Sequence, residues 1–301
     1  MTEKQATKIV ENFLSEKVLD IDSITDRGRV NRIYVLKTAR EKYILRTDLE
    51  EDNIDRFRKE KWCSKVANEQ GVFSPEILSI GLESNHPYMI MSYVEGKGGD
   101  GFTGHEKDKI WSTLGKYAQK IHSIPVDGYG ERMSTPGVFD DSWQRYVDYN
   151  ISSLTPNDQA IKLGVITEKE SKKIKNIFLN LKNVGFKFGL THYDLSLKNT
   201  IVATDGEMYL IDWGSAQVAP VPHIDIAEIL DSSLDENSNQ FSLFLEGYGL
   251  TRQEYEKIKF AIAQLNLLIY MDKLRWAIER RKEKIGHFSQ EVKNKLTKSL
   301  K

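Results

Sequence analysis

The sequence predicts an α+β protein with two lobes: a small antiparallel sheet with helices, followed by a larger, mainly helical part. Alternating apolar and polar residues, which are typical of strands, occur mainly before residue 95, and helical spacing of apolar residues dominates after residue 101. The glycine-rich interval of residues 95–101 separates the two patterns, and we interpret it as a hinge or linker. The predicted domains are therefore residues 1–94, the linker, and residues 102–301.

The first lobe is expected to contain two helices and four strands. Apolar residues at helical spacing predict helices over residues 2–18 and 49–70, and Asp52 or Asn53 could cap the second. Strands are predicted over residues 32–38, 42–47, 76–80 and 88–94. Because only a short polar link joins the first two strands, they are expected to form a hairpin.

The second lobe is expected to be helical apart from one hairpin. Helices are predicted over residues 107–124, 141–154, 168–184 and from residue 225 onward, ending in a long helix over residues 264–284. The hairpin strands are expected at residues 201–202 and 208–211. Asp205 and Gly206 supply the turn between them, so we assign Asp205 to the turn and not to chemistry.

Composition and charge exclude several classes of protein. The chain is 40% hydrophobic and 29% charged with a net charge of -1, so nothing draws it to nucleic acid or to acidic membranes. The single cysteine, Cys63, excludes an internal disulfide. The N-terminus is unlike a signal peptide, and no apolar segment is long enough to span a bilayer. We expect a cytoplasmic monomer or weak dimer that binds neither nucleic acid nor membrane.

Polar side chains flank the predicted hairpin in a specific pattern. The chain reads His-x-Asp-x-x-x-x-Asn from His192 to Asn199, and Asp212 with Gly214 follows the second strand. Both ends of an antiparallel pair lie side by side, so Asp194, Asn199 and Asp212 are expected to converge. Phosphoryl transfer needs this inventory: one carboxylate to orient and deprotonate a hydroxyl, and an amide and a second carboxylate as ligands of Mg²⁺. Polar residues are also common at strand ends, so an Asp–Asn pair by itself would also fit an ordinary hairpin.

The segments His192–Asn199 and Ile211–Gly214 resemble the aminoglycoside phosphotransferase and choline kinase-like family, relatives of the protein kinases. The resemblance implies a bilobal protein-kinase-like fold, ATP or GTP as phosphate donor, and Mg²⁺ as cofactor. It also extends to the helix that ends at His122, which we interpret as a packing and capping histidine.

Residue roles follow from this resemblance. Asp194 is expected to be the catalytic base, and Asn199 and Asp212 the metal ligands. His192 is expected to support the catalytic loop without transferring protons. Asp225, in an Asp-Ile-Ala segment similar to the family's Asp-Leu-Ala, is expected to brace that loop.

The nucleotide site departs from the family in two places. Arg46 stands where the family usually has a lysine, and Glu60 is its best partner. A guanidinium is planar where an ammonium is a point charge, yet both bind phosphate. The phosphate-covering turn holds a single glycine, Gly28, instead of a glycine run, with Asn31 where relatives often have Ser or Asn. The nucleotide-binding candidates are Arg46, Glu60, Gly28, Asn31 and, through their backbone at the hinge, Ser92 and Val94.

The acceptor is expected to be a small molecule. The chain has no Ala-Pro-Glu segment, and only ten residues separate Gly214 from Asp225, too few for a long activation loop. Four acidic residues that follow, Glu228, Asp231, Asp235 and Glu236, are candidates for binding a positively charged acceptor such as an aminoglycoside antibiotic, in a resistance enzyme. They could equally be a solvated helix face, and choline, macrolide, amino-alcohol or sugar acceptors stay open.

Two other classes of function fit parts of the sequence. A nucleotide-binding pseudokinase scaffold would explain the sparse phosphate turn and Arg46, although Asp194, Asn199 and Asp212 are all present. A non-catalytic binding protein for a cationic metabolite would need no nucleotide.

Overall fold

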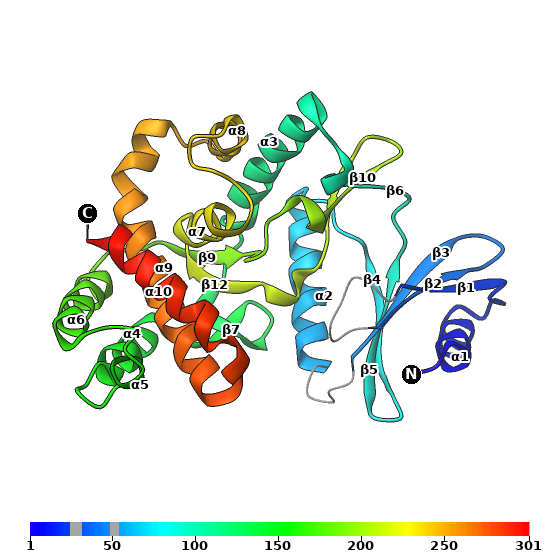
Figure 1. The fold of residues 1–301 in the computed structure, drawn as a ribbon. Helices are drawn as coiled ribbons and strands as arrows, with labels where there is room; N and C mark the ends of the chain where they lie inside the picture. Colours follow the sequence, from blue (N-terminus) through cyan, green and yellow to red (C-terminus); the bar gives the residue numbers. More distant parts are fainter. Residues whose placement is uncertain (25–31, 49–53, 301) are drawn as a thin grey trace. The chain divides into compact units, whose positions relative to one another are not determined.

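Two compact units make up the chain in the computed structural model, which describes residues 1–24, 32–48 and 54–300 (Figure 1). The first unit comprises Met1–Ile110 and Ser196–Ala216, and the second comprises Trp111–Leu195 and Gln217–Lys301. The first unit thus continues beyond the glycine-rich interval and regains a later segment of chain. A functional division at residues 94 and 101 stays a prediction.

Two sheets and two long helices build the first unit. A five-stranded antiparallel sheet has the order β1-β2-β3-β5-β4, and a three-stranded sheet has the order β11-β10-β6. The elements are α1 (Glu3–Leu14), β1 (Asp20–Ile24), β2 (Arg32–Lys37), β3 (Lys42–Thr47), α2 (Ile54–Glu69), β4 (Ile77–Glu83), β5 (His86–Ser92), β6 (Gly96–Gly98), η2 (Gly99–Gly101), η3 (Leu197–Asn199), β10 (Thr200–Ala203), β11 (Met208–Leu210) and η4 (Trp213–Ser215). All four predicted strands and both helices are present. The predicted caps Asp52 and Asn53 lie outside the described residues.

Strand β1 and the end of helix α1 differ from the prediction made from the sequence pattern. Strand β1 was not predicted because four of its five residues are exposed, so it carries no clear alternation. Helix α1 ends at Leu14 and not at residue 18, because Ser15 adopts a left-handed conformation with φ 54°. Its buried face, Ala6 and Val10, packs on the sheet residues Leu36 and Ile90.

The glycine-rich interval contains regular structure, the strand β6 and the short helix η2, and its role as a hinge or linker stays a prediction. Strand β6 pairs antiparallel with β10, with Gly98 opposite Ile201. A Cβ on Gly96 would lie 2.4 Å from the carbonyl oxygen of Val202. The missing side chain therefore allows a close approach of two strands, a use of glycine that composition does not distinguish from flexibility.

The second unit is mainly helical around a four-stranded sheet of order β8-β7-β12-β9. Its elements are α3 (Gly104–Ile121, which begins in the first unit), β7 (Asp127–Thr135), β8 (Val138–Asp141), α4 (Trp143–Ser153), α5 (Gln159–Lys162), α6 (Glu168–Lys182), β9 (Phe188–Thr191), β12 (Gln217–Pro220), α7 (His223–Ser232), α8 (Asn239–Tyr248), α9 (Arg252–Arg280), η5 (Lys282–Lys284) and α10 (Ile285–Ser299). Strands β7, β8, β9 and β12 were not predicted. Helix α9 begins at Arg252 and not at residue 264. Thr251 and Glu254 form a capping box at this earlier start.

The core of the second unit lies between α4, α6, α9 and α10. Helices α9 and α10 run side by side near the C-terminus (Figure 1). The fully buried side chains there include Ile174, Phe178, Leu267, Met271 and Val292.

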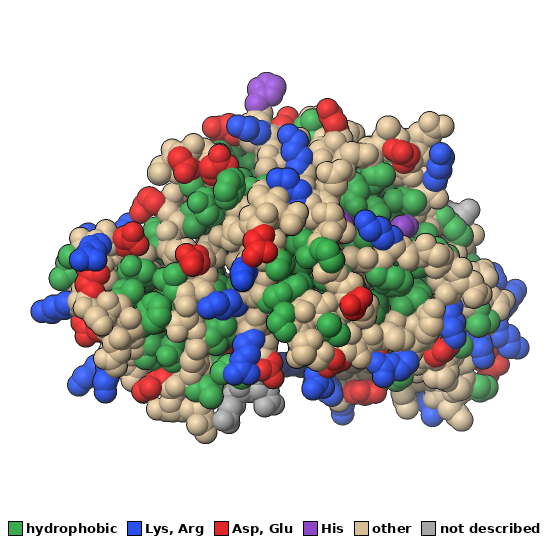
Figure 2. Space-filling model, turned by 180° about the vertical axis from the view of Figure 1, so that it is seen from behind, with side chains coloured by type: hydrophobic (Ala, Val, Ile, Leu, Met, Phe, Trp, Pro, Cys, Tyr) green, Lys and Arg blue, Asp and Glu red, His purple; other side chains and the backbone are tan. Residues whose placement is uncertain are grey.

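Charge is mixed over the surface. Lys and Arg side chains lie among Asp and Glu side chains on the face drawn in Figure 2, in keeping with the net charge of -1. Within the described ranges, none of the helices is both long and apolar enough to cross a bilayer.

Candidate active site

In the first unit, a buried ion pair joins the sheet to α2. Arg46 on β3 donates from Nη1 to Oε1 of Glu60 on α2 at 2.8 Å, and the two side chains are 9% and 1% exposed. The predicted pair is therefore formed. Each charge depends on the other, because removing one partner of a buried pair leaves an uncompensated charge at a cost of about 3–5 kcal/mol.

The Arg46 guanidinium also contacts Asp212. Arg46 Nη1 lies 3.4 Å from Asp212 Oδ1, a longer and weaker contact, and the Asp212 side chain is 51% exposed. Its backbone is left-handed, with φ 65° and ψ 62°. That conformation costs a residue with a Cβ about 1–2 kcal/mol and must be held by its surroundings.

The predicted hairpin is present, and it brings Asn199 and Asp212 to one end. Strand β10 pairs with β11, with Thr200 opposite Leu210. One residue beyond that pair, the N–H of Ile211 donates to the carbonyl of Asn199 at 2.9 Å, directly before Asp212. An amide and a carboxylate are hard oxygen donors of the kind that Mg²⁺ takes, usually with one or two carboxylates and substrate phosphates.

The other turn of this hairpin is structural, as predicted. Asp205 Oδ1 accepts a hydrogen bond from the N–H of Glu207 at 3.0 Å, and Gly206 has φ 88°. This is ordinary side-chain stabilisation of a turn.

In the second unit, the loop after β9 carries His192, Tyr193 and Asp194. His192 is fully buried and Asp194 is partly exposed. Tyr193 is left-handed, with φ 65°, and its N–H donates to Asp225 Oδ1 at 3.1 Å. Asp225 at the start of α7 thus holds the backbone next to Asp194, the bracing position expected for it.

His122 does more than pack and cap, which corrects its interpretation. Its Nε2 lies 2.8 Å from Asp225 Oδ2, and its Nδ1 lies 2.9 Å from the hydroxyl of Tyr248. Both oxygens of the buried Asp225 are therefore engaged. Sequence reasoning missed Tyr248, because it lies on α8, far along the chain from the loop that it supports.

Tyrosines and one acid from three further elements gather near Tyr193. Tyr129 on β7 and Tyr146 on α4 have ring centroids 5.5 Å apart. Burial raises the pKa of Tyr146 well above its ordinary value, and the charges of Asp272, Tyr129 and Tyr193 add to the effect. Burial likewise raises the pKa of Asp272, while nearby Arg275 opposes this. No sequence motif marks these residues, because they come from separate elements.

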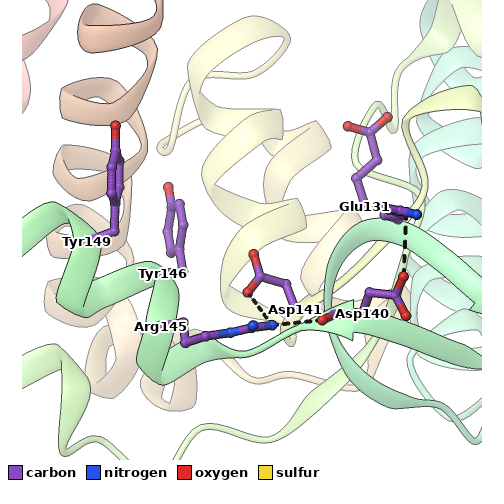
Figure 3. Close-up of a pocket in the computed structure, with 7 residues that line it drawn as sticks. Glu131, Asp140, Asp141, Arg145, Tyr146 and Tyr149 are labelled. Atoms are coloured by element: carbon purple, nitrogen blue, oxygen red, sulfur yellow. Dashed lines mark hydrogen bonds and ion pairs between the residues drawn. The ribbon is translucent and has the colours of Figure 1, made fainter.

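Acidic side chains also line a cavity of about 590 Å³ beside α4. Its lining residues are Glu131, Arg132, Asp140, Asp141, Arg145, Tyr146 and Tyr149. Arg145 lies 3.2 Å from Asp141 Oδ1 and donates to the Asp140 carbonyl at 2.8 Å, and Figure 3 draws both contacts as dashed lines. Tyr146 and Tyr149, on α4, lie at the left of the drawing.

The acidic run after Asp225 has counter-charges that its sequence neighbours do not show. Glu228 pairs with Lys273 at 3.5 Å, and Asp231 contacts both Lys295 and Tyr270. Glu236 pairs with Arg252 at 3.2 Å and with Lys259. Asp235 accepts from the N–H of Asn237 at 2.7 Å. The helices α9 and α10 supply these cations, so the run is not an uncompensated negative surface.

The remaining nucleotide candidates stand as follows. Ser92 ends β5, and its N–H already donates to the carbonyl of Glu76 at 2.9 Å. That hydrogen bond engages one of the two backbone groups of Ser92, and the contact of its backbone with adenine stays a prediction. Val94 lies between β5 and β6. Gly28 and Asn31 lie outside the described residues.

Comparison with known proteins identifies the family of this chain. A family model described as the phosphotransferase enzyme family (APH) matches residues 24–261. No curated protein matches the chain.

Solved structures share the fold. Aminoglycoside phosphotransferase APH(4)-Ia superposes with a TM-score of 0.71 at 15% identity, over 99% of each chain. The GDP and kanamycin complex of APH(2")-IIia gives 0.69 at 17% identity, over 98% of each chain. Spectinomycin phosphotransferase APH(9)-Ia with ADP and spectinomycin gives 0.61 at 13%, over 100% of this chain and 98% of the other.

At such identities the likeness shows the fold, and the predicted bilobal protein-kinase-like class is confirmed. The family model covers most of the sequence, including the hairpin and the loops on either side of it. The chain therefore belongs to the phosphotransferase enzyme family.

Proposed function

We propose that this phosphotransferase transfers the γ-phosphate of ATP or GTP to a hydroxyl group of a small molecule, with Mg²⁺ as cofactor. The observation that supports this most is the end of the β10–β11 hairpin. There Asn199 lies next to the residue before Asp212, and Asp212 shares the Arg46 guanidinium with Glu60. Two oxygen ligands for a metal and one cation for phosphate are thus assembled within one unit.

The nucleotide would be held by charge and backbone contacts. Arg46 would bind the α- and β-phosphate oxygens, with Glu60 fixing its orientation through Oε1. Val94 and the turn with Gly28 and Asn31 are the further candidates. Asn199 and Asp212 would hold Mg²⁺, which would neutralise charge on the phosphate oxygens. No three His, Cys, Asp or Glu side chains form a metal-binding group in the described parts of the chain, consistent with a site completed by phosphates.

Asp194 would accept the proton of the acceptor hydroxyl. Its loop is supported by buried His192 and by the hydrogen bond from Tyr193 to Asp225. Catalysis would then consist of orientation and charge stabilisation, because the chain needs to form no covalent intermediate.

Replacing Asp194 tests the assignment. Asp194→Ala should lower kcat by at least ~10³-fold because the general base is lost, while nucleotide affinity measured by calorimetry changes little. Asp205→Asn, in the turn of the β10–β11 hairpin, is the control and should keep near-normal turnover. Near-normal turnover of Asp194→Ala would exclude this role.

The acceptor that we favour is an aminoglycoside-type antibiotic, which makes a role in resistance the corresponding expectation. The cavity beside α4 has a volume of about 590 Å³, within the range typical of small-molecule sites. Its carboxylates suit amino groups, and Tyr146 and Tyr149 offer ring faces to a sugar or an ammonium group. Two of the structural relatives have been solved in complex with kanamycin and with spectinomycin.

Asp141 and Asp148 provide a matched pair for testing this cavity. Asp141 lines it and is paired with Arg145 at 3.2 Å, whereas Asp148 on α4 is paired with Lys182 at 2.6 Å and is not among the lining residues. Asp141→Asn should raise the acceptor KM by about tenfold, or ~1.4 kcal/mol, and leave the nucleotide KM unchanged. Asp148→Asn should change neither. Equal effects of both variants would remove the cavity as the acceptor site.

A panel of donors and acceptors decides the substrate class. ATP and GTP are supplied separately with aminoglycosides, macrolides, choline and simple sugars, and phosphate transfer is followed by mass spectrometry. Transfer to a non-aminoglycoside alone would correct the acceptor, while nucleotide binding without any transfer would favour a pseudokinase scaffold.

A further inference from the structure

One face of α2 contacts the segment that follows Asp212. Lys59 is only 3% exposed, and its Nζ donates to the carbonyl of Ala216 at 2.8 Å. One turn earlier, Arg56 Nε donates to the carbonyl of Gly214 at 3.3 Å. Arg56 stands four positions before Glu60, the partner of Arg46, and therefore shares its side of the helix, while Lys59 stands directly before Glu60 and three positions after Arg56.

Hydrogen bonds to Ser74 hold the same segment as well. The indole of Trp213 donates to Ser74 Oγ at 2.9 Å, and Ser64 on α2 donates to the same oxygen at 3.0 Å. Trp213 is 1% exposed. Residues 212, 213, 214 and 216 thus each contact another segment of the first unit, to which they belong.

Gly214 is shaped to this arrangement. A Cβ at that position would lie 2.9 Å from Arg56 Nη2 and 3.2 Å from its Nε. The guanidinium therefore occupies the space that a side chain would need. The glycine of the Asp-x-Gly segment allows Arg56 to reach the backbone carbonyl.

We infer that Arg56 and Lys59 are positioning residues that hold Asp212 in its metal-binding conformation. Asp212 is left-handed and its side chain is half exposed, so packing of its own side chain does not fix it. The carbonyls two and four positions later are fixed instead, by charged donors whose hydrogen bonds are stronger than neutral ones. This inference rests on the proposed role of Asp212 as a metal ligand.

The hydrogen bonds of Arg56 and Lys59 are distinct from those of the Arg46–Glu60 pair. That pair contacts the Asp212 carboxylate, whereas Arg56 and Lys59 contact only backbone carbonyls after it among the hydrogen bonds described above. Loss of Arg56 or Lys59 should therefore keep the Asp212 carboxylate as a metal ligand but make its orientation less well fixed. Metal binding should weaken more than nucleotide binding.

The test measures metal affinity directly. Binding of Mn²⁺ to the protein with AMP-PNP is followed by electron paramagnetic resonance, and Mg²⁺ dependence of turnover is measured in parallel. Arg56→Met and Lys59→Met should each raise the Mn²⁺ Kd and the half-saturating Mg²⁺ by about tenfold, with AMP-PNP affinity changed less than threefold. Arg56→Lys, which keeps a charged donor, should restore most of the affinity. Lys65→Met, at an exposed position of the same helix, should behave as wild type.

Two further variants keep the inference open to refutation if Lys59→Met fails to fold. Gly214→Ala should displace Arg56 and weaken Mn²⁺ binding as Arg56→Met does, and the double variant should be no worse than either single one. Additive losses, or wild-type Mn²⁺ affinity in Arg56→Met, would overturn the inference. Asp212→Asn separates the two proposals: if it retains Mn²⁺ affinity the proposed function fails, and if it alone loses affinity only the positioning role fails.

Discussion

At the scale of single residues, burial decides what a charge does. Arg46 and Glu60 lie fourteen positions apart in sequence, and their pairing was predicted because the family places a cation and an acid there. That Arg46 also reaches Asp212 was not predicted, because the contact depends on the left-handed backbone of Asp212. The same sequence reasoning gave no reason to single out Lys59, which lies next to Glu60.

His223 is a residue whose buried state should appear as a pH dependence of stability. Burial lowers its pKa to about 4, partly offset by a hydrogen bond with the backbone of Val221, and its ring packs against Phe186 at 4.9 Å. The folded protein therefore keeps the imidazole neutral where the unfolded chain, with an ordinary value of about 6.5, binds a proton. The free energy of unfolding should fall by ~1–3 kcal/mol as the pH decreases from about 6.5 to 4.

Denaturant unfolding at several pH values measures this effect. His223→Gln should remove that part of the slope, whereas His105→Gln, at an exposed position on α3, should keep it. The same slope in His223→Gln as in the wild type would show that other groups cause it.

At the scale of elements, boundaries followed local chemistry and contacts did not. Capping residues set the start of α9, and a left-handed serine set the end of α1. Strand β1 and the strands of the sheet in the second unit escaped prediction. Strand β1 is mostly exposed and β9 and β12 are four residues long and mostly buried, so none of them shows a clear alternation. The pairing of β6 with β10 depends on glycine as a space, and only the partner strand reveals that use.

Helices α3 and α8 cross with their backbones in contact, which predicts an unusual cost for one methyl group. A Cβ on Gly115 would lie 2.1 Å from the Phe244 carbonyl oxygen and 2.8 Å from the Tyr248 nitrogen. Gly115→Ala should therefore destabilise the fold by ~1–3 kcal/mol or more. It should also disturb the Tyr248–His122 contact and so lower turnover.

Gly286 in α10 is the matched control, because nothing lies within 4 Å of a Cβ built there. Gly286→Ala should leave stability unchanged or raise it by up to about 1 kcal/mol, since alanine favours helix. Thermal melting of both variants measures the difference. Similar melting temperatures would mean that α3 and α8 separate easily.

At the scale of the whole molecule, the chain enters and leaves each unit more than once. The first unit needs residues 196–216, because β10 pairs with β6 and the Leu210 N–H donates to the Phe73 carbonyl at 2.8 Å. A fragment of residues 1–110 should therefore lack a cooperative melting transition. Joining residues 196–216 to it through a flexible linker should restore one. A transition in the short fragment at the temperature of the full chain would contradict this.

The family, the fold class and the pattern of candidate site residues could be predicted from the sequence. Asp194, Asn199 and Asp212 lie within nineteen residues and around one hairpin, so spacing along a short stretch of chain carries their pattern. A phosphotransferase that uses a carboxylate base and Mg²⁺ would need oxygen donors of these types, and the roles of the three residues stay a prediction.

The distant residues that support these three candidate site residues became visible only in the folded structure. Tyr248 and His122 meet at Asp225, Lys59 meets Ala216, and the cations of α9 and α10 meet the acids after Asp225. Each of these contacts joins segments separated by tens of residues or more. Such contacts depend on how helices pack, and helix packing follows from shape and burial over the whole chain, which no local pattern encodes.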